Sequence, residues 1–109
     1  MAQTFDTIEK YPGLSMEEAR QALDAACAVA KADLGEFTDH FPSSNSFGGF
    51  YEPTENVEWT TGFWTGSLWL AYEHTQDPAF RKAAEIQVES FLNRIENKID
   101  VNHHDMGFL

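Results

Sequence analysis

The sequence has little cysteine and no long apolar run. Cys27 is the only cysteine among 109 residues, so no disulfide can form within the chain. It lies in the segment AACAVA, whose small apolar residues indicate a buried side chain rather than a reactive thiol. No apolar run approaches the ~20 residues of a membrane-spanning helix, and the first residues lack the charged and apolar regions of a signal peptide. We therefore expect a cytoplasmic protein with no membrane partner.

Basic residues are also scarce. Seven Lys and Arg stand against eighteen Asp and Glu, which gives a formal net charge of −11. No lysine or arginine falls between Ala32 and Phe80. Such a negative field repels polyanions, so we expect no nucleic-acid partner and no attachment to anionic lipid.

The chain contains enough apolar material for a packed core. Hydrophobic residues make up 42% and aromatic residues 14%, which is unlike a disordered chain. A length of 109 residues fits a single domain, or part of one, over 1–109. Two irregular parts are expected within it, a polar segment at 1–13 and a long loop at 36–55. The loop contains proline, serine, asparagine and paired glycine, and short extended pieces near 47–51 are compatible with it.

Helical patterns occupy most of the remaining chain. A first helix is predicted over 16–34, because Ser15 and Glu18 match a capping box and Gly35 can end it. A second helix is predicted to begin near Thr60 or Thr61 and to end near Gln76.

A third helix is predicted over 78–98, with Asp77 as its N-cap and Pro78 at its first position. It is amphipathic, with an apolar stripe and a polar face. The expected stripe is Phe80, Ala84, Val88, Phe91, Leu92, Ile95 and Ile99. The expected polar face is Arg81, Lys82, Glu85, Glu89, Asn93, Arg94 and Glu96.

The segment 56–72 differs from the other helical segments because its helical part is apolar almost all round. It holds all three tryptophans, of which Trp64 and Trp69 are expected in the core. A helix of this kind is usually buried on every side. Paired with the amphipathic helix that follows after a very short connection, it predicts an antiparallel pair in an all-α fold. Such pairs occur both in α/α toroids and in bundles. Three helices cannot cover the apolar one, so we expect either a longer chain or a partner.

The densest polar cluster is His103, His104 and Asp105. Histidine and carboxylate can bind a metal, but adjacent histidines point in different directions and no second cluster completes the ligands. Asp105 could instead be the N-cap of an apolar helix that starts at Met106. A third possibility is a catalytic carboxylate beside a histidine at the mouth of an apolar pocket, where a protonated acid can donate its proton.

Trp59 precedes the apolar helix, after Glu55, Asn56 and Glu58. Two roles suit a tryptophan at this junction. It can close the end of the core, or it can offer its indole face to the C–H face of a sugar ring while nearby carboxylates and amides bind the hydroxyl groups.

The segments NVEWTTGFWTGSLWLAYE and HHDMGFL, in this order, resemble the unsaturated glucuronyl hydrolases of glycoside hydrolase family 88. The resemblance covers roughly 11–109, as the N-terminal portion of the family's fold. It implies an (α/α)6 toroid with the site in a central cavity and no cofactor. It also implies a substrate, an oligosaccharide that carries a 4,5-unsaturated uronic acid at its non-reducing end.

The resemblance implies roles for three residues. Asp105 matches the first of two aspartates that act on the substrate, His104 matches a substrate-contacting histidine, and Trp59 matches a tryptophan that lines the site. The second aspartate would lie beyond Leu109. We therefore expect the 109-residue chain to be incomplete and inactive as a hydrolase on its own. The alternatives are a carbohydrate-binding or interaction module without catalysis, a self-associating all-α protein, and an unsaturated rhamnogalacturonyl hydrolase.

Overall fold

The structure combines α-helices with one β-hairpin. The computed structural model describes residues 13–109, so the expected polar segment 1–13 lies outside the described residues except for Gly13. The elements are α2 (Met16–Asp33), β1 (Phe41–Phe47), β2 (Phe50–Thr54), α3 (Thr61–Thr75), α4 (Pro78–Glu96) and the 3-10 helix η1 (His104–Phe108). No helix within 13–109 is long and apolar enough to span a membrane.

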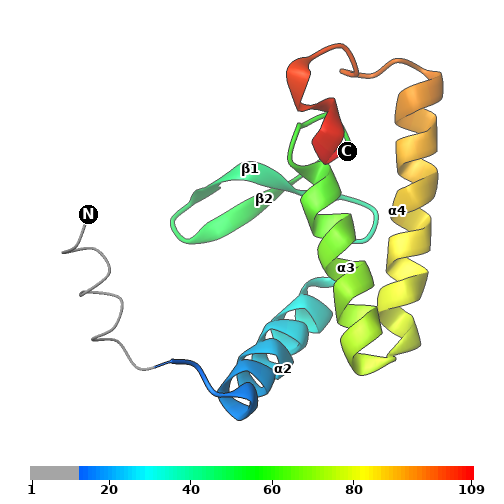
Figure 1. The fold of residues 1–109 in the computed structure, drawn as a ribbon. Helices are drawn as coiled ribbons and strands as arrows, with labels where there is room; N and C mark the ends of the chain where they lie inside the picture. Colours follow the sequence, from blue (N-terminus) through cyan, green and yellow to red (C-terminus); the bar gives the residue numbers. More distant parts are fainter. Residues whose placement is uncertain (1–12) are drawn as a thin grey trace.

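Helices α3 and α4 form the expected antiparallel pair (Figure 1). The turn between them is tight because Gln76 takes the left-handed conformation with φ of 58°. The Asp77 carboxylate then accepts a hydrogen bond from Ala79 N at 3.0 Å, and Pro78 occupies the first position of α4. The predicted cap is therefore confirmed, and it places the start of α3 beside the end of α4.

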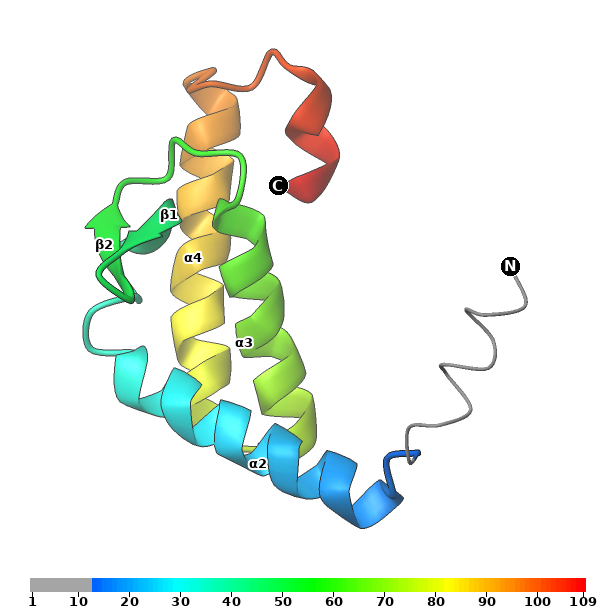
Figure 2. The same cartoon turned by 90° about the vertical axis from the view of Figure 1, so that its left-hand side faces the viewer.

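Helix α2 lies across the pair near the turn that joins α3 to α4, as Figure 2 shows. Its start is as predicted, since Ser15 Oγ accepts from Glu18 N at 3.1 Å. Cys27 is buried, as expected, in the cluster where the three helices meet. The other fully buried members of that cluster are Leu68, Ala71, Phe80, Ala83 and Ala84.

The all-α expectation is wrong for the segment 36–55, which contains β1 and β2. The strands pair antiparallel, and Phe47 faces Phe50 across a two-residue turn of Gly48 and Gly49. Both glycines have positive φ, 59° and 84°, as the tight hairpin turn requires. The register shifts between Pro42 and Ser46, which is typical of a bulged edge strand that carries proline. The base of the hairpin is anchored to α4 by an edge-to-face contact between Phe41 and Phe91, with ring centroids 5.7 Å apart.

The predicted polar face of α4 is wrong at Arg94. The side of α4 that faces the rest of the chain buries Phe80, Ala84, Gln87 and Arg94, and Arg94 is only 1% exposed. The predicted stripe residues Val88, Leu92 and Ile95 are instead exposed. Buried polar groups occupy the inner face because carbonyl groups of neighbouring loops are available there to pair with them.

Helix α3 is only partly covered within this chain. Thr61, Thr65, Leu68 and Ala71 form its buried face, and Trp64 and Trp69 are partly buried against the core. Phe63 and Leu70 are more than half exposed, at 52% and 63%. The expectation of burial on every side therefore does not hold for this chain by itself.

Candidate functional site

The predicted site residues lie at the end of the molecule where α3 begins and α4 ends. The turn 55–60 enters α3 there, and the loop 97–103 leaves α4 there. The antiparallel pairing thus brings Trp59 close to the segment 103–105, although many residues separate them in sequence. Figure 1 shows η1, in red, seated beside the start of α3.

A shallow hollow of about 390 Å³ lies between these two loops. Its lining residues are Ser44, Val57, Glu58, Trp59, Asp100, His103 and Asp105. Three carboxylates and an imidazole therefore surround one indole. The Glu58 carboxylate accepts a hydrogen bond from the backbone N–H of Ser44, and this bond ties the hairpin to the edge of the hollow.

Two other hollows on the molecule are of similar or larger size, but their linings differ. One of about 400 Å³ lies between the hairpin and α3, and one of about 500 Å³ lies on the outer side of α4 near Trp69. Neither is lined by a histidine. Among these three hollows, the one beside Trp59 is distinguished by a histidine and several carboxylates around an indole, groups able to bind hydroxyls and move a proton.

Trp59 is held by aromatic neighbours and remains 44% exposed. Its ring meets those of Phe63 and Phe108 edge to face, with centroid distances of 6.3 and 5.8 Å. Phe63 and Phe108 stack on each other at 5.2 Å. These contacts hold the indole in place and leave part of it exposed, which is compatible with a stacking platform.

His103, rather than Asp105, caps the short helix η1. The Asp105 backbone N–H donates to His103 Nδ1 at 3.2 Å. His103 Nε2 lies 2.9 Å from the carbonyl oxygen of Asp100. A carbonyl can only accept, so His103 is the neutral tautomer with its proton on Nε2. The expectation that Asp105 caps an α-helix is therefore wrong, and its carboxylate is not used as a cap.

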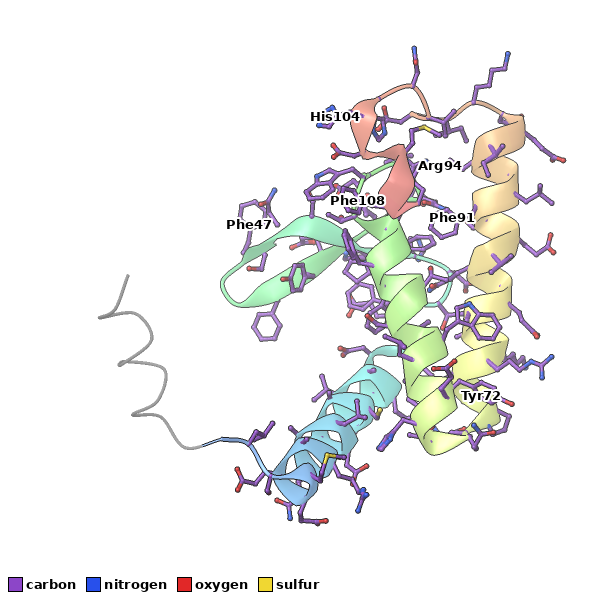
Figure 3. The ribbon with its side chains drawn as sticks, in the orientation of Figure 1. Phe47, Tyr72, Phe91, Arg94, His104 and Phe108 are labelled. Carbon is purple, nitrogen blue, oxygen red and sulfur yellow. The ribbon has the colours of Figure 1, made fainter. Side chains whose placement is uncertain are left out.

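His104 lies outside the hollow. Its side chain is 92% exposed, and its Nε2 is 3.4 Å from Asp105 Oδ2. Figure 3 shows the labelled His104 ring pointing away from the body of the molecule. The structure thus brings Trp59 and Asp105 to one hollow and leaves His104 at its outer edge. The roles of all three residues in binding and catalysis stay predictions.

Several neighbours in this site have no clear signal in the sequence. Ser44 comes from a hairpin that was expected to be a loop, and Asp100 belongs to an irregular turn with φ of 46°. His103 was part of the predicted cluster, but its capping contact depends on local backbone geometry. Within 13–109, no group of three or more His, Cys, Asp or Glu side chains is arranged to hold a metal ion.

Comparison with curated proteins places the chain beside one kind of enzyme. It is 44% identical over 100 residues to an unsaturated chondroitin disaccharide hydrolase from Streptococcus pneumoniae, which is 92% of this chain and 25% of that protein. It is 39% identical over 90 residues to an unsaturated glucuronyl hydrolase from Bacillus sp. GL1, which is 83% of this chain and 24% of that protein. The chain therefore spans about a quarter of the length of these relatives. No family model matches it.

Solved structures agree with the sequence comparison. The crystal structure of the unsaturated glucuronyl hydrolase from Streptococcus agalactiae matches with a TM-score of 0.86 and 41% identity, over 91% of this chain and 26% of that one. An aspartate-to-asparagine variant of that enzyme, complexed with dGlcA-GalNAc6S, matches with a TM-score of 0.87 over 92% of this chain and 26% of that one. The resemblance to unsaturated glucuronyl hydrolases is confirmed. These matches support the expected helical architecture and show that the β-hairpin does not separate the chain from them.

Proposed function

We propose that this chain forms part of a hydrolase that removes a 4,5-unsaturated uronic acid from the non-reducing end of oligosaccharides left by polysaccharide lyases. The chain's resemblance to unsaturated glucuronyl hydrolases is the premise. The observation that carries the proposal is that Asp105 and the exposed Trp59 both line one hollow. The Streptococcus agalactiae complex favours unsaturated chondroitin-type disaccharides as the first substrates to examine.

The proposed reaction is a hydration of the C4=C5 double bond. A carboxylic acid gives a proton to C4, and water adds its oxygen to C5 as it loses a proton to a carboxylate. The resulting hemiketal opens to a ketone, and the hemiacetal at C1 then releases the rest of the glycan as an alcohol. One water is consumed, and no bond to the protein forms.

In this proposal, Asp105 works beside the sugar hydroxyls with a second carboxylate, and Trp59 stacks on the ring. The arrangement of the first loop supports this, because Glu58 is occupied by the Ser44 N–H and Trp59 remains 44% exposed. In the same proposal His104, whose Nε2 lies 3.4 Å from Asp105 Oδ2 at the outer edge of the hollow, contacts the bound sugar. The finer (α/α)6 toroid architecture is part of the same proposal.

The test is a chimera in which this chain replaces the residues that it matches in the Streptococcus pneumoniae relative. We expect the chimera to consume unsaturated chondroitin disaccharide, followed as loss of the ultraviolet absorbance of the double bond. We expect Asp105→Asn to lower kcat by about 10²- to 10⁴-fold, the usual contribution of a positioned acid or base. The matched control is Asp39→Asn, because Asp39 is exposed and lies outside the hollow.

Unchanged turnover in the Asp105→Asn chimera would remove Asp105 from the mechanism. A folded chimera that binds the disaccharide without consuming it would favour the carbohydrate-binding module. The 109-residue chain is assayed in parallel, and we expect no turnover from it, because the hollow is shallow and open to water in this chain.

A further inference from the structure

The two loops that form the candidate site meet on a single buried side chain. Arg94, near the end of α4, is 1% exposed although the sequence places it among polar surface residues. In Figure 3 the labelled Arg94 lies between the end of α4 and η1. Burial lowers the pKa of its guanidinium, and the Asp100 carboxylate partly counters this effect. An arginine remains charged in such a place and must satisfy its donors.

One edge of the guanidinium binds the loop that carries Trp59. Arg94 Nη1 donates to the carbonyl oxygen of Glu58 at 2.8 Å and to Asn56 Oδ1 at 3.1 Å. It also lies 3.1 Å from Thr61 Oγ1, whose hydroxyl donates to the same Asn56 oxygen at 2.7 Å. Since Glu58 immediately precedes Trp59, this edge sets the backbone from which the indole projects.

The remaining donors bind the loop that leads to Asp105. Arg94 Nε donates to the carbonyl oxygen of Ile99 at 2.9 Å, and Nη2 donates to that of Asp100 at 2.9 Å. The Asp100 carbonyl also accepts from His103 Nε2 at 2.9 Å, and His103 Nδ1 accepts from the Asp105 N–H at 3.2 Å. A continuous series of hydrogen bonds therefore joins Arg94 to the backbone of Asp105.

This second loop has a conformation that needs support. Lys98 and Asp100 both have positive φ, 54° and 46°, which non-glycine residues seldom adopt. The Asp100 carboxylate contributes little to holding it, since it is 60% exposed and lies 3.8 Å from Nη2. The carbonyl contacts with the Arg94 side chain thus hold this loop, together with the backbone hydrogen bonds of Lys98 and Ile99 to the end of α4.

We propose that Arg94 is a positioning residue for the candidate site, which fixes the spacing between the Trp59 loop and the Asp105 loop. His103, which is hydrogen-bonded to both Asp100 and Asp105, fixes the backbone of Asp105 relative to Arg94. The proposal rests on the proposed function for its effect on catalysis. Its geometry needs arginine in particular, because a planar fork of five donors can bind two loops at once. The single ammonium of a lysine cannot reach both sets of carbonyls.

The matched control is Gln87, which lies on the same face of α4 and is fully buried. Its side chain binds Thr65 and the carbonyl oxygen of Phe37, and it touches neither loop of the site. Arg94→Met and Gln87→Met thus each remove a buried polar group from one helix face. Arg94→Lys is the second variant. It keeps the positive charge, so it can still be measured if Arg94→Met fails to fold.

The first measurement is nuclear magnetic resonance on the 109-residue chain. We expect Arg94→Met and Arg94→Lys to shift or broaden the Trp59 indole N–H and Asp105 amide signals. The ring nitrogens of His103 should lose the signature of a single Nε2–H tautomer. Gln87→Met should leave all three unchanged. A folded Arg94 variant with the unaltered signals of the parent would overturn the proposal.

The second measurement is kinetic and uses the chimera described above. A loss of folded enzyme lowers apparent kcat at constant KM, whereas displacement of Trp59 also raises KM. We expect Arg94→Lys to lower kcat on the order of 10²-fold, as misplacement by about 1 Å can do, and to raise KM several-fold. Gln87→Met should change neither once the rates are corrected for the folded fraction.

The outcomes separate the two proposals. Altered signals in the isolated chain, together with a folded but inactive parent chimera, contradict the proposed function and leave the structural role of Arg94 intact. An active parent whose Arg94→Lys variant keeps the same kcat and KM contradicts the positioning role and leaves the proposed function intact.

Discussion

At the scale of single residues, Gly62 is the point on which the contact between α3 and η1 depends. A Cβ at this position would lie 1.9 Å from the carbonyl oxygen of Phe108 and 2.9 Å from its carbonyl carbon. The backbone of η1 can approach α3 this closely because Gly62 has no side chain. The stacking of Phe63 on Phe108, and with it the support of Trp59, requires that approach.

Replacement of Gly62 by alanine should therefore displace η1. We expect Gly62→Ala to destabilise the chain and to remove the ring contacts between Phe63 and Phe108, because the clash involves backbone that cannot rotate away. Gly66→Ala is the control, since open space surrounds Gly66 in the same helix. It should stabilise the chain by about 0.5–1 kcal/mol through the higher helix propensity of alanine.

Urea unfolding measures the stability of both glycine variants. Nuclear magnetic resonance contacts between ring protons of Phe63 and Phe108 show whether the two rings still stack. If Gly62→Ala were as stable as Gly66→Ala and kept the ring contacts, the close approach of η1 to α3 would be wrong.

At the scale of elements, α2 is tied to the turn between α3 and α4 by the ion pair of Lys31 with Asp77. The hydrogen bond from Lys31 lowers the pKa of Asp77 most, and the Ala79 N–H adds to this effect. The folded chain therefore favours the carboxylate form. Its contribution to stability is complete above the unfolded-state pKa of about 3.9 and is lost as pH falls through the lower pKa of the folded state.

We expect the stability of the unsubstituted chain to fall more steeply below about pH 4 than that of Asp77→Asn, which cannot titrate. Urea unfolding over a pH series measures the difference, and Asp39→Asn is the control because Asp39 is exposed. Parallel curves for the parent and Asp77→Asn would show that the Lys31 contact does not form in solution.

The helices were largely predictable from the sequence, and the hairpin was not. Local signals mark the helices, such as the Ser15 cap and the adjacent Asp77 and Pro78, and the structure follows them within a few residues. The hairpin has only Gly48 and Gly49 as a local signal. Its base depends on Phe41 packing against Phe91 on α4, a contact between distant parts of the chain that periodicity cannot indicate.

The site, like the fold, was predictable only in part. Motif resemblance identified Trp59 and Asp105, and the structure places both on one hollow. The prediction for Arg94 was wrong because helical patterning assigns a residue to the surface by its polarity alone. Burial of a polar side chain depends instead on whether hydrogen-bond acceptors lie within reach of its donors. Those partners are carbonyl groups, which every residue carries and no sequence pattern marks.

At the scale of the whole molecule, large apolar side chains remain exposed on all three helices α2, α3 and α4. Val88, Leu92 and Ile95 form a stripe along α4 at 47%, 49% and 61% exposure. The chain spans about a quarter of its relatives' length. We expect its exposed apolar surfaces to bind other apolar surfaces. The net charge of −11 opposes association between copies, and salt screens that repulsion.

We therefore expect the 109-residue chain to self-associate at micromolar concentration and more strongly as salt is raised. Leu92→Glu should shift it toward the monomer, because it places a charge within the α4 stripe. Asn93→Glu adds the same charge at a neighbouring exposed position off the stripe and should have little effect. Sedimentation velocity over a concentration series tests this, and equal effects of both substitutions would exclude the α4 stripe as the contact.

The buried position of Arg94 also imposes an order on how the chain can become organised during synthesis. Asn56 leaves the ribosome 38 residues ahead of its Arg94 partner. At about 5–20 residues per second, the turn before Trp59 spends roughly 2–8 s without the group that will hold it. Through that interval the Glu58 carbonyl and Asn56 Oδ1 have only the Thr61 hydroxyl and water as partners, and the charged donor is absent. The aromatic end of α3 is thus a late-maturing part of the molecule, although it lies near the middle of the sequence.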